Sequence, residues 1–406
     1  MTYKEMLELY KNGQLPKDEA EEVRKEIEKQ EAIGDYLFSD DMPELEGLSP
    51  DLETESGDNE DRFISLVRKS IRRAFIKTGV VSGFVVLVLV LSVIFILPKA
   101  VDKFYYNPNE VAGEEKESGI ETTKMSLDLS VYSELFMPQA FRNEVKAESE
   151  GYGEYFISIP QVLYSPNGTL KTVNGKLERN KLRLYDTDVF TEPAGNAFML
   201  PENVRGSSIF TDTDGSYIGP NGNIETAKEY LDEKPDIYYG AFVSLKEVTD
   251  YEEFIRWIDE NDLGQSGVWA AVYADDVMED GTRLLMDENV GFRVRTGGIC
   301  IDYDRDTYPM LSLLDAEDND YLSYLDGEKM KTHFISLLQY QRDNLGFMHI
   351  MQGHTTYGEG FFNDYISYVE ENGLKVYGFY IEEKKDTINK LWEDERVSYI
   401  YAKNIK

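Results

Sequence analysis

The residue types that most often carry chemistry are scarce in this chain. It holds three histidines, His333, His349 and His354, and one cysteine, Cys300. No histidine stands at ligand spacing from the cysteine, whereas a zinc site needs several such ligands at short intervals. Motifs for a serine nucleophile, a metalloprotease helix or a phosphate-binding glycine loop are also absent. We therefore expect no enzyme, no metal site and no cofactor.

One acidic run begins like a calcium loop. Asp302, Asp304 and Asp306 alternate in DYDRD, and carboxylate oxygens are the ligands that calcium prefers. Such a loop also needs Gly at its sixth position and Glu at its twelfth, where this chain has Thr307 and Leu313. The sequence therefore favours a solvated acidic loop over a calcium site.

The lone cysteine also bears on the fold. Cys300 lies in GGICIDY, which is typical of a strand, and we interpret it as a small buried apolar side chain rather than a reactive thiol. With one cysteine the chain has no internal disulfide, so its fold must rest on an apolar core. The roughly 300 residues that follow the apolar segment described next are enough to bury one.

The element that divides the chain is the segment 78–97, TGVVSGFVVLVLVLSVIFIL, which contains no ionisable side chain. A helix of twenty residues spans roughly 30 Å, the thickness of the hydrocarbon core of a bilayer. The alternative is a buried core helix, but core helices rarely run this long without a polar face. The segment starts far from Met1 and no small-residue cleavage site follows it, so we expect a membrane span rather than a cleaved signal peptide.

Charges beside this segment predict its orientation. Basic residues crowd its N-terminal side and are fewer on the other, and the Lys/Arg excess marks the cytoplasmic side of a span. We expect a single-pass protein of the cell membrane, with the N-terminus in the cytoplasm and the C-terminus outside. The helix Phe63–Ile76 would meet anionic lipid headgroups. The flanking basic residues are Arg68, Lys69, Arg72, Arg73 and Lys77 before the span, and Lys99 and Lys103 after it.

The whole chain is strongly acidic. It holds 42 basic and 77 acidic residues, for a formal charge of −35, of which residues 1–77 contribute 12 basic and 20 acidic ones. Phosphates of a nucleic acid would be repelled by such a chain, so we expect no direct nucleic-acid partner.

The predicted cytoplasmic part, residues 1–48, has the pattern of a small helical module. Apolar residues at 3–4 spacing predict a helix over Thr2–Tyr10. Gly13 suits a left-handed position after it, and Pro16 opens a second helix that runs to about Ile33. These helices have few apolar positions, which leaves two interpretations open: a minor hairpin on the membrane surface, or a docking module whose apolar stripe a partner protein completes.

An acidic segment follows this module. Twelve acids and no base lie between Lys29 and Arg62. Its first half also contains aromatic residues and leucines, and either binds a basic surface with apolar pockets or is a solvated spacer. Residues 49–61 have the composition of a disordered linker, so 49–77 form an acidic linker followed by a basic juxtamembrane segment.

Outside, we expect an α+β fold without disulfides. Residues 98–124 are polar and predict a stalk, and 125–230 predict a β-rich, partly irregular region. The alternating pattern SLDLSVYSE (126–134) predicts a strand, as do EYFISIPQVLY (154–164) and KLERNKLRLYD (176–186). Ser165–Gly168 and Asn174-Gly175 are turn signals between them.

Residues 231–406 predict two strand–helix–strand units. The first has strands at 237–245 and 267–273 around a helix at 250–261 with Thr249 as a candidate N-cap, and the second has strands at 375–381 and 397–402 around a helix at 385–394. The first reads as a βαβ unit with parallel strands. Both units share Y-G-x-[FY]-[VI], beginning at Tyr239 and Tyr377. Two further helices are expected between the units, at 331–342 and 361–371.

Three stretches of this pattern resemble a known family. Tyr10-Lys-Asn-Gly13-Gln-Leu-Pro16, continued by Glu19, Val23 and Ile27, is similar to an opening helix-turn-helix, and DYISYVEENGLKVYG (364–378) is similar to a C-terminal motif. The strand at Tyr239-Gly240 and the helix Phe254–Trp257 are also similar to segments of this family. The family is the sigma factor regulator family of Gram-positive bacteria, membrane-bound anti-sigma factors, and the chain looks most like the anti-sigma-M type of bacilli. It departs from the broader anti-sigma group at 28–31, where the zinc motif is missing.

The resemblance implies that the cytoplasmic helices bind an extracytoplasmic-function sigma factor and cover surfaces it needs for RNA polymerase. Acids between 31 and 46 would face basic surface on the sigma factor. A further membrane protein stays open as a partner beside the sigma factor and the lipid bilayer. The alternative function is an envelope-facing binding or sensor protein whose cytoplasmic tail is only an anchor. The expected sigma-binding residues are Leu7, Tyr10, Leu15, Val23, Ile27, Tyr36, Leu37 and Phe38.

Overall fold

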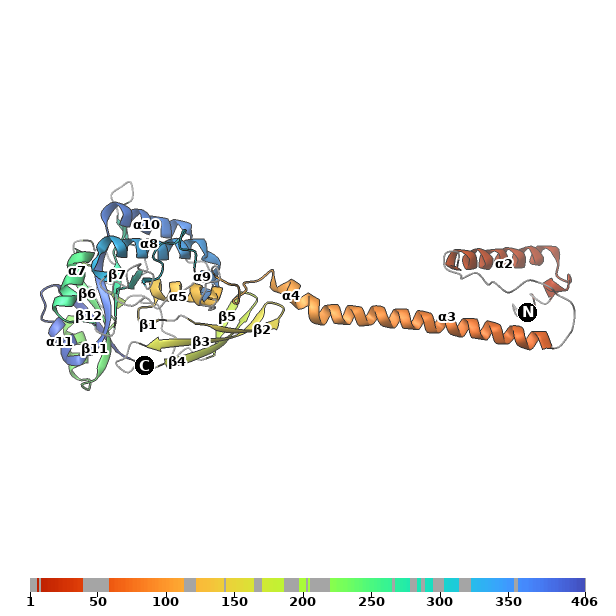
Figure 1. The fold of residues 1–406 in the computed structure, drawn as a ribbon, viewed down its shortest axis with the longest axis horizontal. Helices are drawn as coiled ribbons and strands as arrows, with labels where there is room; N and C mark the ends of the chain where they lie inside the picture. Colours follow the sequence, from red (N-terminus) through yellow and green to blue (C-terminus); the bar gives the residue numbers. More distant parts are fainter. Residues whose placement is uncertain are drawn as a thin grey trace. The chain divides into compact units, whose positions relative to one another are not determined.

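A computed structural model describes most of the chain in two compact units, 1–85 and 86–406, which are treated one at a time below (Figure 1). For residues 30–38, 58–66, 140–141, 161–163, 170, 276–277, 283–285 and 323 it describes the backbone alone. The described residues are 6, 9–38, 58–112, 122–141, 144–163, 170–185, 197–201, 204, 220–264, 267–277, 283–285, 289–294, 303–313, 323–353 and 357–405.

The first unit opens with a helical hairpin. Residues 9–11 are helical, and the chain reverses at Gly13, whose φ of 65° is in the left-handed region as predicted. The turn is closed by hydrogen bonds from Gly13 N to Tyr10 O and from Gln14 N to Leu9 O, at 3.1 and 2.9 Å. Helix α2 then runs over Lys17–Phe38, five residues beyond the predicted end at Ile33.

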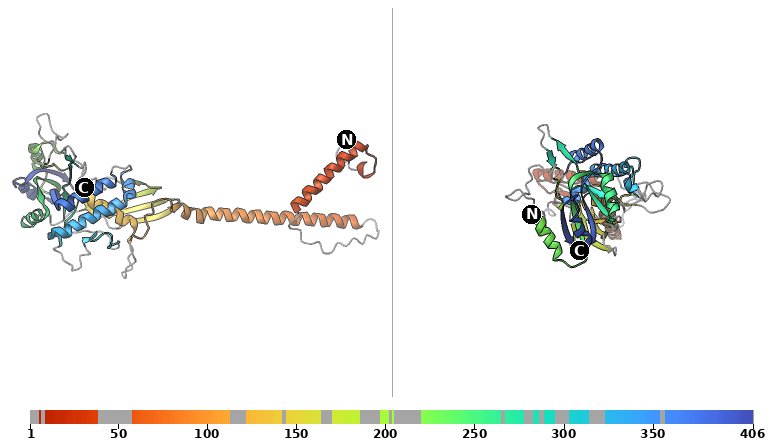
Figure 2. Two further views of the ribbon diagram at one scale, coloured as in Figure 1. Left: turned by 90° about the horizontal axis from the view of Figure 1, so that it is seen from above. Right: turned by 90° about the vertical axis from the view of Figure 1, so that its left-hand side faces the viewer.

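Helix α3, Asp58–Leu91, continues into a π-helical turn, Ser92–Ile96, and then into α4, Leu97–Asp102 (Figures 1 and 2). The stretch 67–102 is long and apolar enough to cross a membrane, which fits the predicted span at 78–97. The prediction of a disordered linker over 49–61 is wrong for its last four residues. Asp58, Glu60 and Asp61 stand in the first turn of α3, where carboxylates are favourable against the helix dipole.

The second unit contains two antiparallel sheets. The smaller one orders β1 (Ala140–Phe141), β3 (Glu154–Leu163), β4 (Leu170–Glu178) and β5 (Lys181–Leu184), and β2 (Lys146–Gly151) also pairs with β3. Asn174-Gly175 was predicted to be a turn but lies inside β4, paired with Ser158 and Ile157. The turn that follows is at Arg179-Asn180, with φ of 49° and 70°. The other predicted turn, Ser165–Gly168, and Cys300 lie outside the described residues.

The stretch predicted as the first outer strand is a helix. Residues 126–134 lie within α5, Lys124–Phe136, which begins at an N-cap where Thr123 accepts from Ser126 N. Every residue from Met125 to Phe136 is buried. An alternating pattern identifies a strand because only one face is buried. In a helix buried all round, polar and apolar residues can alternate freely as long as each polar group finds a partner.

The predicted stalk is partly incorporated into the domain. Tyr106 packs against its core, Pro108 is buried, and Val111 forms a bridge with Thr123. Residues 104–112 therefore pack against the domain and do not form a separate stalk. Residues 113–121 are outside the described part.

The larger sheet has the order β10–β7–β11–β6–β12, and all its pairs are antiparallel. Both predicted strand–helix–strand units are present, but in neither are the two strands neighbours, since β6 also lies between β11 and β12. β6 and β7 run parallel with β11 between them, which is a split βαβ arrangement. Thr249 was predicted as an N-cap, but that position is Asp250. The elements are β6 (Tyr238–Asp250), α7 (Tyr251–Glu260), β7 (Val268–Val272), β10 (Gly291–Arg293), β11 (Lys375–Lys384), α11 (Lys385–Leu391) and β12 (Val397–Asn404).

The shared Y-G-x-[FY]-[VI] motif has a structural counterpart. Its two copies form the paired central strands β6 and β11, and equivalent positions Phe242 and Tyr380 pair directly. On one face Phe379 packs against Phe254 and Trp257 of α7, with ring centroids 5.5 Å apart in each case. On the other face Phe242, Trp269 and Tyr380 form a second cluster that Phe198 covers.

Further helices surround this sheet (Figure 1). The two predicted between the units are α8 (Gly327–Asp343) and α10 (Glu359–Asn372), each longer than expected. Two helices were not predicted, α9 (Leu345–Gln352) and α6 (Ile224–Asp232), and α6 falls in the region expected to be irregular β structure. Short β8 (Asp275–Val277), β9 (Arg283–Leu285) and a 3-10 turn at Ser323–Leu325 complete the described elements.

Candidate functional site

The predicted sigma-binding residues lie on the hairpin of the first unit. Val23 is 1 % exposed and therefore lies inside the hairpin. Tyr10, Leu15 and Ile27 are half-buried. Leu7 lies outside the described residues, and Tyr36, Leu37 and Phe38 belong to the end of α2, where the backbone alone is described. Among the side chains described in residues 6–29, Val23 is thus the one apolar side chain that is buried, and Tyr10, Leu15 and Ile27 form a partly exposed stripe.

The predicted metal candidates do not converge. Among the described side chains no group of three or more His, Cys, Asp and Glu residues could hold a metal ion. Asp304 caps the local turn instead, accepting from Asp306 N, Thr307 N and the Thr307 hydroxyl at 2.7–3.1 Å. These bonds lower the pKa of Asp304. His349 is exposed on α9, while His354 and Asp302 lie outside the described residues.

One end of the second unit is tied to the end of the long helix by two hydrogen bonds, each between a side chain and a backbone group. We call Gly151, Tyr152 and Gly153 the 151–153 turn; it joins β2 to β3 and has φ of 83°, 58° and 75°. The Tyr152 hydroxyl donates to Val93 O at 2.7 Å, and Gly153 N donates to Asp102 Oδ1 at 2.5 Å. The turn is therefore held at two heights along the end of the helix.

The sequence of the helix end explains why Val93 accepts this bond. In the π-helical turn an N–H bonds to the carbonyl five residues earlier, as Leu97 N–H does to Ser92 O. Val93 O would therefore accept from the N–H of residue 98. Residue 98 is proline, which has no N–H. An unsatisfied carbonyl is costly in an apolar surrounding, and the Tyr152 hydroxyl supplies the missing donor.

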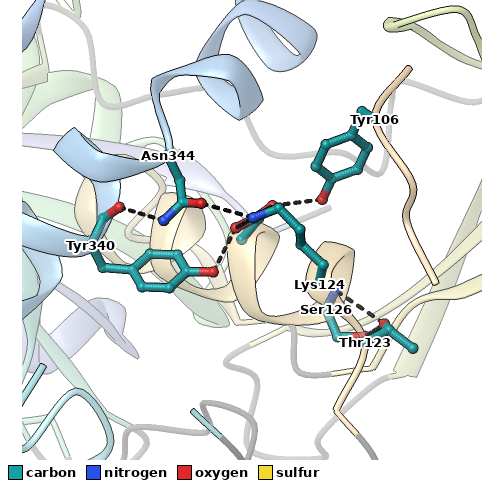
Figure 3. A network of polar contacts seen from close by, with 7 residues as sticks. Tyr106, Thr123, Lys124, Ser126, Tyr340 and Asn344 are labelled. Carbon is teal, nitrogen blue, oxygen red and sulfur yellow. Dashed lines mark hydrogen bonds and ion pairs between the residues drawn. The ribbon is translucent and has the colours of Figure 1, made fainter. Parts of the chain in front are cut away.

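Just after the end of the long helix, the chain is bound at Tyr106 by a buried carboxylate, that of Asp128. Tyr106 N donates to Asn180 Oδ1 at 2.8 Å, and its hydroxyl donates to Asp128 Oδ2 of α5 at 2.6 Å. The Tyr340 hydroxyl of α8 donates to Asp128 Oδ1, also at 2.6 Å. Lys124 Nζ lies 3.2 Å from Asp128 Oδ2 and 2.7 Å from Asn344 Oδ1. Figure 3 shows Tyr106, Lys124, Tyr340 and Asn344 converging from three elements.

Burial sets the acidity of this group. Asp128 is 1 % exposed, and loss of hydration raises its pKa, against the opposing effects of Lys124 and the two tyrosine hydroxyls. Burial and the neighbouring Asp128 carboxyl raise the pKa of Tyr106 well above its ordinary value. The Tyr106–Asp128 contact is thus a hydrogen bond from a neutral phenol.

A second buried carboxylate lies near the other end of α5. Glu134 is 1 % exposed, and its Oε1 lies 3.0 Å from Nε2 of the fully buried His333. His333 Nδ1 faces Met310 O at 2.7 Å and must carry a proton there, because a carbonyl only accepts. One further proton therefore lies between His333 and Glu134, either as imidazolium with carboxylate or as imidazole with carboxylic acid. Glu134 O also accepts from Trp269 Nε1 at 2.6 Å, which joins α5 to the larger sheet.

These groups connect elements rather than face a substrate. Asp128, Glu134 and His333 are each at most 1 % exposed, so no external molecule touches them in this conformation. What they can do is hold the helix exit, α5, α8 and the larger sheet in one arrangement through buried hydrogen bonds, which are energetically demanding to break.

A third buried acid stands on the aromatic face of the larger sheet. Glu382 is 2 % exposed, and its Oε1 accepts from the Tyr380 hydroxyl at 3.0 Å. Burial raises its pKa to about 8, while Tyr380 and Lys403 act in the opposite direction. Glu382 is therefore largely protonated at neutral pH.

The described surface includes one open pocket of about 570 Å³ beside α10. Carboxylates of Asp275, Asp364 and Glu371 line it, with Tyr273 and Tyr368 in T-shaped contact, centroids 5.7 Å apart. Its one lysine, Lys375, is paired with Asp250 at 2.7 Å.

The sequence did not indicate Asp128, Glu134, His333 or Glu382 as a group. Their signal was present but weak: Asp128 and Glu134 are acids in an otherwise apolar stretch, which is unusual unless they are paired. The sequence could not predict their hydrogen-bond partners, since Tyr340 and His333 lie about 200 positions away along the chain.

Comparison with known proteins leaves the chain without a relative: no family model, no curated protein and no solved structure matches it. The resemblance to the sigma factor regulator family therefore stays a prediction from the motifs quoted above.

Proposed function

We propose that this chain is a membrane-anchored anti-sigma factor. Its cytoplasmic N-terminal segment would sequester an extracytoplasmic-function sigma factor, and its outer domain would regulate that binding. The apolar segment 78–97 of the helix at 67–102 would cross the cell membrane once, with residues 1–77 on the cytoplasmic side, as the basic residues before that segment favour.

The observation that carries this proposal is the unfinished core of the cytoplasmic hairpin. Val23 is the one apolar side chain described as buried in residues 6–29, while Tyr10, Leu15 and Ile27 remain half-buried. A hairpin with so little interior gains stability when a partner covers its stripe. Helix α2 has 22 residues, which corresponds to roughly 33 Å of contact length.

Charge favours the same kind of partner. The twelve acids between Lys29 and Arg62 are adjacent to this stripe in sequence. The surfaces with which a sigma factor meets DNA are basic, so the acids would speed association and orient it. Nucleic acid itself would be repelled.

Binding of the full chain in detergent to a purified sigma factor tests the proposal. Alanine at Val23, Ile27, Leu37 and Phe38 should abolish most of the affinity, because buried apolar anchors carry most of an interface's energy. Lys25→Ala is the matched control, since Lys25 is exposed on the same helix. Unchanged binding by the fourfold variant would refute the docking site.

The alternative function is an envelope-facing binding protein, and the pocket beside α10 is the observation that favours it. The two functions differ in where activity resides. Expression of residues 1–77 alone should lower transcription from a sigma-dependent promoter if the anti-sigma proposal holds. If no such promoter responds, the cytoplasmic segment is an anchor and the pocket becomes the principal site.

A further inference from the structure

The hydrogen bond between Tyr152 and Val93 fixes the depth of the 151–153 turn, given the membrane span proposed above. Val93 lies within the apolar segment, six residues before Lys99, which is roughly 9 Å along a helix axis. A side chain that bonds to Val93 O lies at the same depth. Tyr152 must therefore reach below the level at which Lys99 meets water.

The turn is shaped to press against the helix at this level. A Cβ on Gly151 would come within 3.0 Å of the Pro98 ring, and a Cβ on Gly153 would come within 2.5 Å of the Tyr105 ring. Both glycines also have positive φ. Only glycine permits this approach, and it leaves the Tyr152 side chain as the part of the turn that extends along the helix.

The side chains around the turn are those that favour a membrane interface. Phe104 is 83 % exposed, which is unfavourable for a phenylalanine ring in water. Tyr105 and Tyr152 carry rings with a polar end, and Lys99 and Lys103 are exposed beside them. Aromatic rings at the headgroup level with lysines reaching outward are typical of residues that anchor a protein at the bilayer surface.

The acids beside the turn are grouped around one lysine. The nearest acids on β2 and β3, Glu150 and Glu154, are paired with Lys176 at 3.1 and 2.9 Å. Lys176 also pairs with Glu178 at 3.3 Å, so its single charge offsets these carboxylates only in part, and Lys99 and Lys103 bring further positive charge to the same end of the domain.

We propose that the 151–153 turn and Phe104 form a second membrane contact, inserted in the outer interface of a phospholipid bilayer. The domain is then held to the bilayer at two points, the helix and the turn, and cannot rotate about the end of the span. The inference rests on the proposed membrane span, so its test must examine the span separately.

The test uses the full chain in phosphatidylethanolamine–phosphatidylglycerol vesicles, on a Cys300→Ser background. A nitroxide is attached in separate variants at Phe104→Cys, Tyr152→Cys, Val88→Cys in the middle of the span, and Lys390→Cys on exposed α11 as the control. Collision rates with oxygen, which partitions into lipid, and with a water-soluble nickel chelate give the depth of each label. Circular dichroism confirms that every variant is folded, and Phe104→Cys leaves the Tyr152–Val93 bond intact.

We expect positions 104 and 152 to collide with the nickel chelate several-fold less often than position 390, and position 88 to be deeper still. If 104 and 152 are as accessible to the chelate as 390 while 88 is protected, the second contact is refuted and the span stands. If 88 is itself accessible to the chelate, the span fails, and this inference fails with it.

Discussion

The two units of this protein differ most in how they treat their interiors. In the first, one apolar side chain, Val23, is buried among the described positions. In the second, a core of several dozen apolar side chains surrounds buried Asp128, Glu134, His333 and Glu382. The second unit can afford buried ionisable groups because many apolar contacts compensate for them.

The two units should therefore respond differently to binding and to protonation. A hairpin with a minimal core responds to whatever covers it, because a partner contributes much of its stability. A domain with buried, paired acids keeps one arrangement until a specific hydrogen bond breaks or a proton moves. The four predictions below test this contrast, beginning with the largest expected effect.

The strongest test of the outer core is Phe379→Ala. Phe379 is fully buried between Phe254 and Trp257, so its loss should destabilise the outer domain by about 3–5 kcal/mol. Chemical unfolding in detergent, followed by tryptophan fluorescence, measures this, since all three tryptophans lie in the outer domain. Phe104→Ala removes the same ring from an 83 % exposed position and should leave the midpoint unchanged. Equal shifts for both variants would contradict the core assignment.

Asp128→Ala examines the buried link between the helix exit and α8. It removes the acceptor that the hydroxyls of Tyr106 and Tyr340 share and the carboxylate partner of Lys124, which keeps Asn344 Oδ1. Removing one partner of a buried charged pair should destabilise the domain by about 3 kcal/mol. Tyr106→Phe removes one of these bonds and should have a smaller effect, about 1 kcal/mol. Equal unfolding midpoints of Asp128→Ala and the wild type would show that the network contributes no stability.

Glu382 gives the outer domain a predicted pH dependence. Its pKa is raised from 4.5 to about 8 in the folded state, so the folded chain binds the proton more tightly than the unfolded chain. Stability should therefore fall as pH rises from about 5 to about 8.5, by an amount on the order of 2–3 kcal/mol. Glu382→Gln mimics the protonated acid and should flatten this slope, with the variant more stable than wild type at pH 8.5. Parallel pH profiles for the two proteins would exclude Glu382 as the source.

The sequence predicted well the elements of the larger sheet that carry a long apolar run or a clear apolar stripe. β6, β11 and β12 start within one residue of their predicted starts because their apolar runs begin there, and α7 does so because of its amphipathic stripe. The prediction of a strand over residues 126–134 was wrong because α5 is buried on all sides. In such a helix polar residues can alternate with apolar ones when each polar group has a partner, so the alternation does not indicate a sheet with one buried face. Asn174-Gly175 has the strongest local turn signal, yet pairing with β3 holds it extended.

Local sequence patterns could not predict the order of the strands in the larger sheet. The two strand–helix–strand units were predictable, but the insertion of β11 between β6 and β7 depends on the pairing of strands more than 100 residues apart. The buried site has the same limitation, since Asp128 and Glu134 acquire their roles from Tyr106, Tyr340 and His333. In the first unit the sequence predicted the reversal at Gly13, because its positive φ is a local property.

Val23→Ala is the smallest change in stability and the most informative about the first unit. Removing two buried methyl groups should lower hairpin stability by roughly 1.6 kcal/mol, at about 0.8 per group. That is small beside Phe379→Ala, but no other described apolar side chain of residues 6–29 is buried to compensate for it. Amides 9–29 in the full chain should therefore become nearly unprotected against hydrogen exchange, while the fluorescence midpoint of the second unit stays constant.

Addition of a sigma factor that binds this hairpin should restore protection, because binding stabilises the folded form by mass action. Lys25→Ala serves as the control, and protection in Val23→Ala equal to that in the control would mean that the hairpin does not depend on its small core.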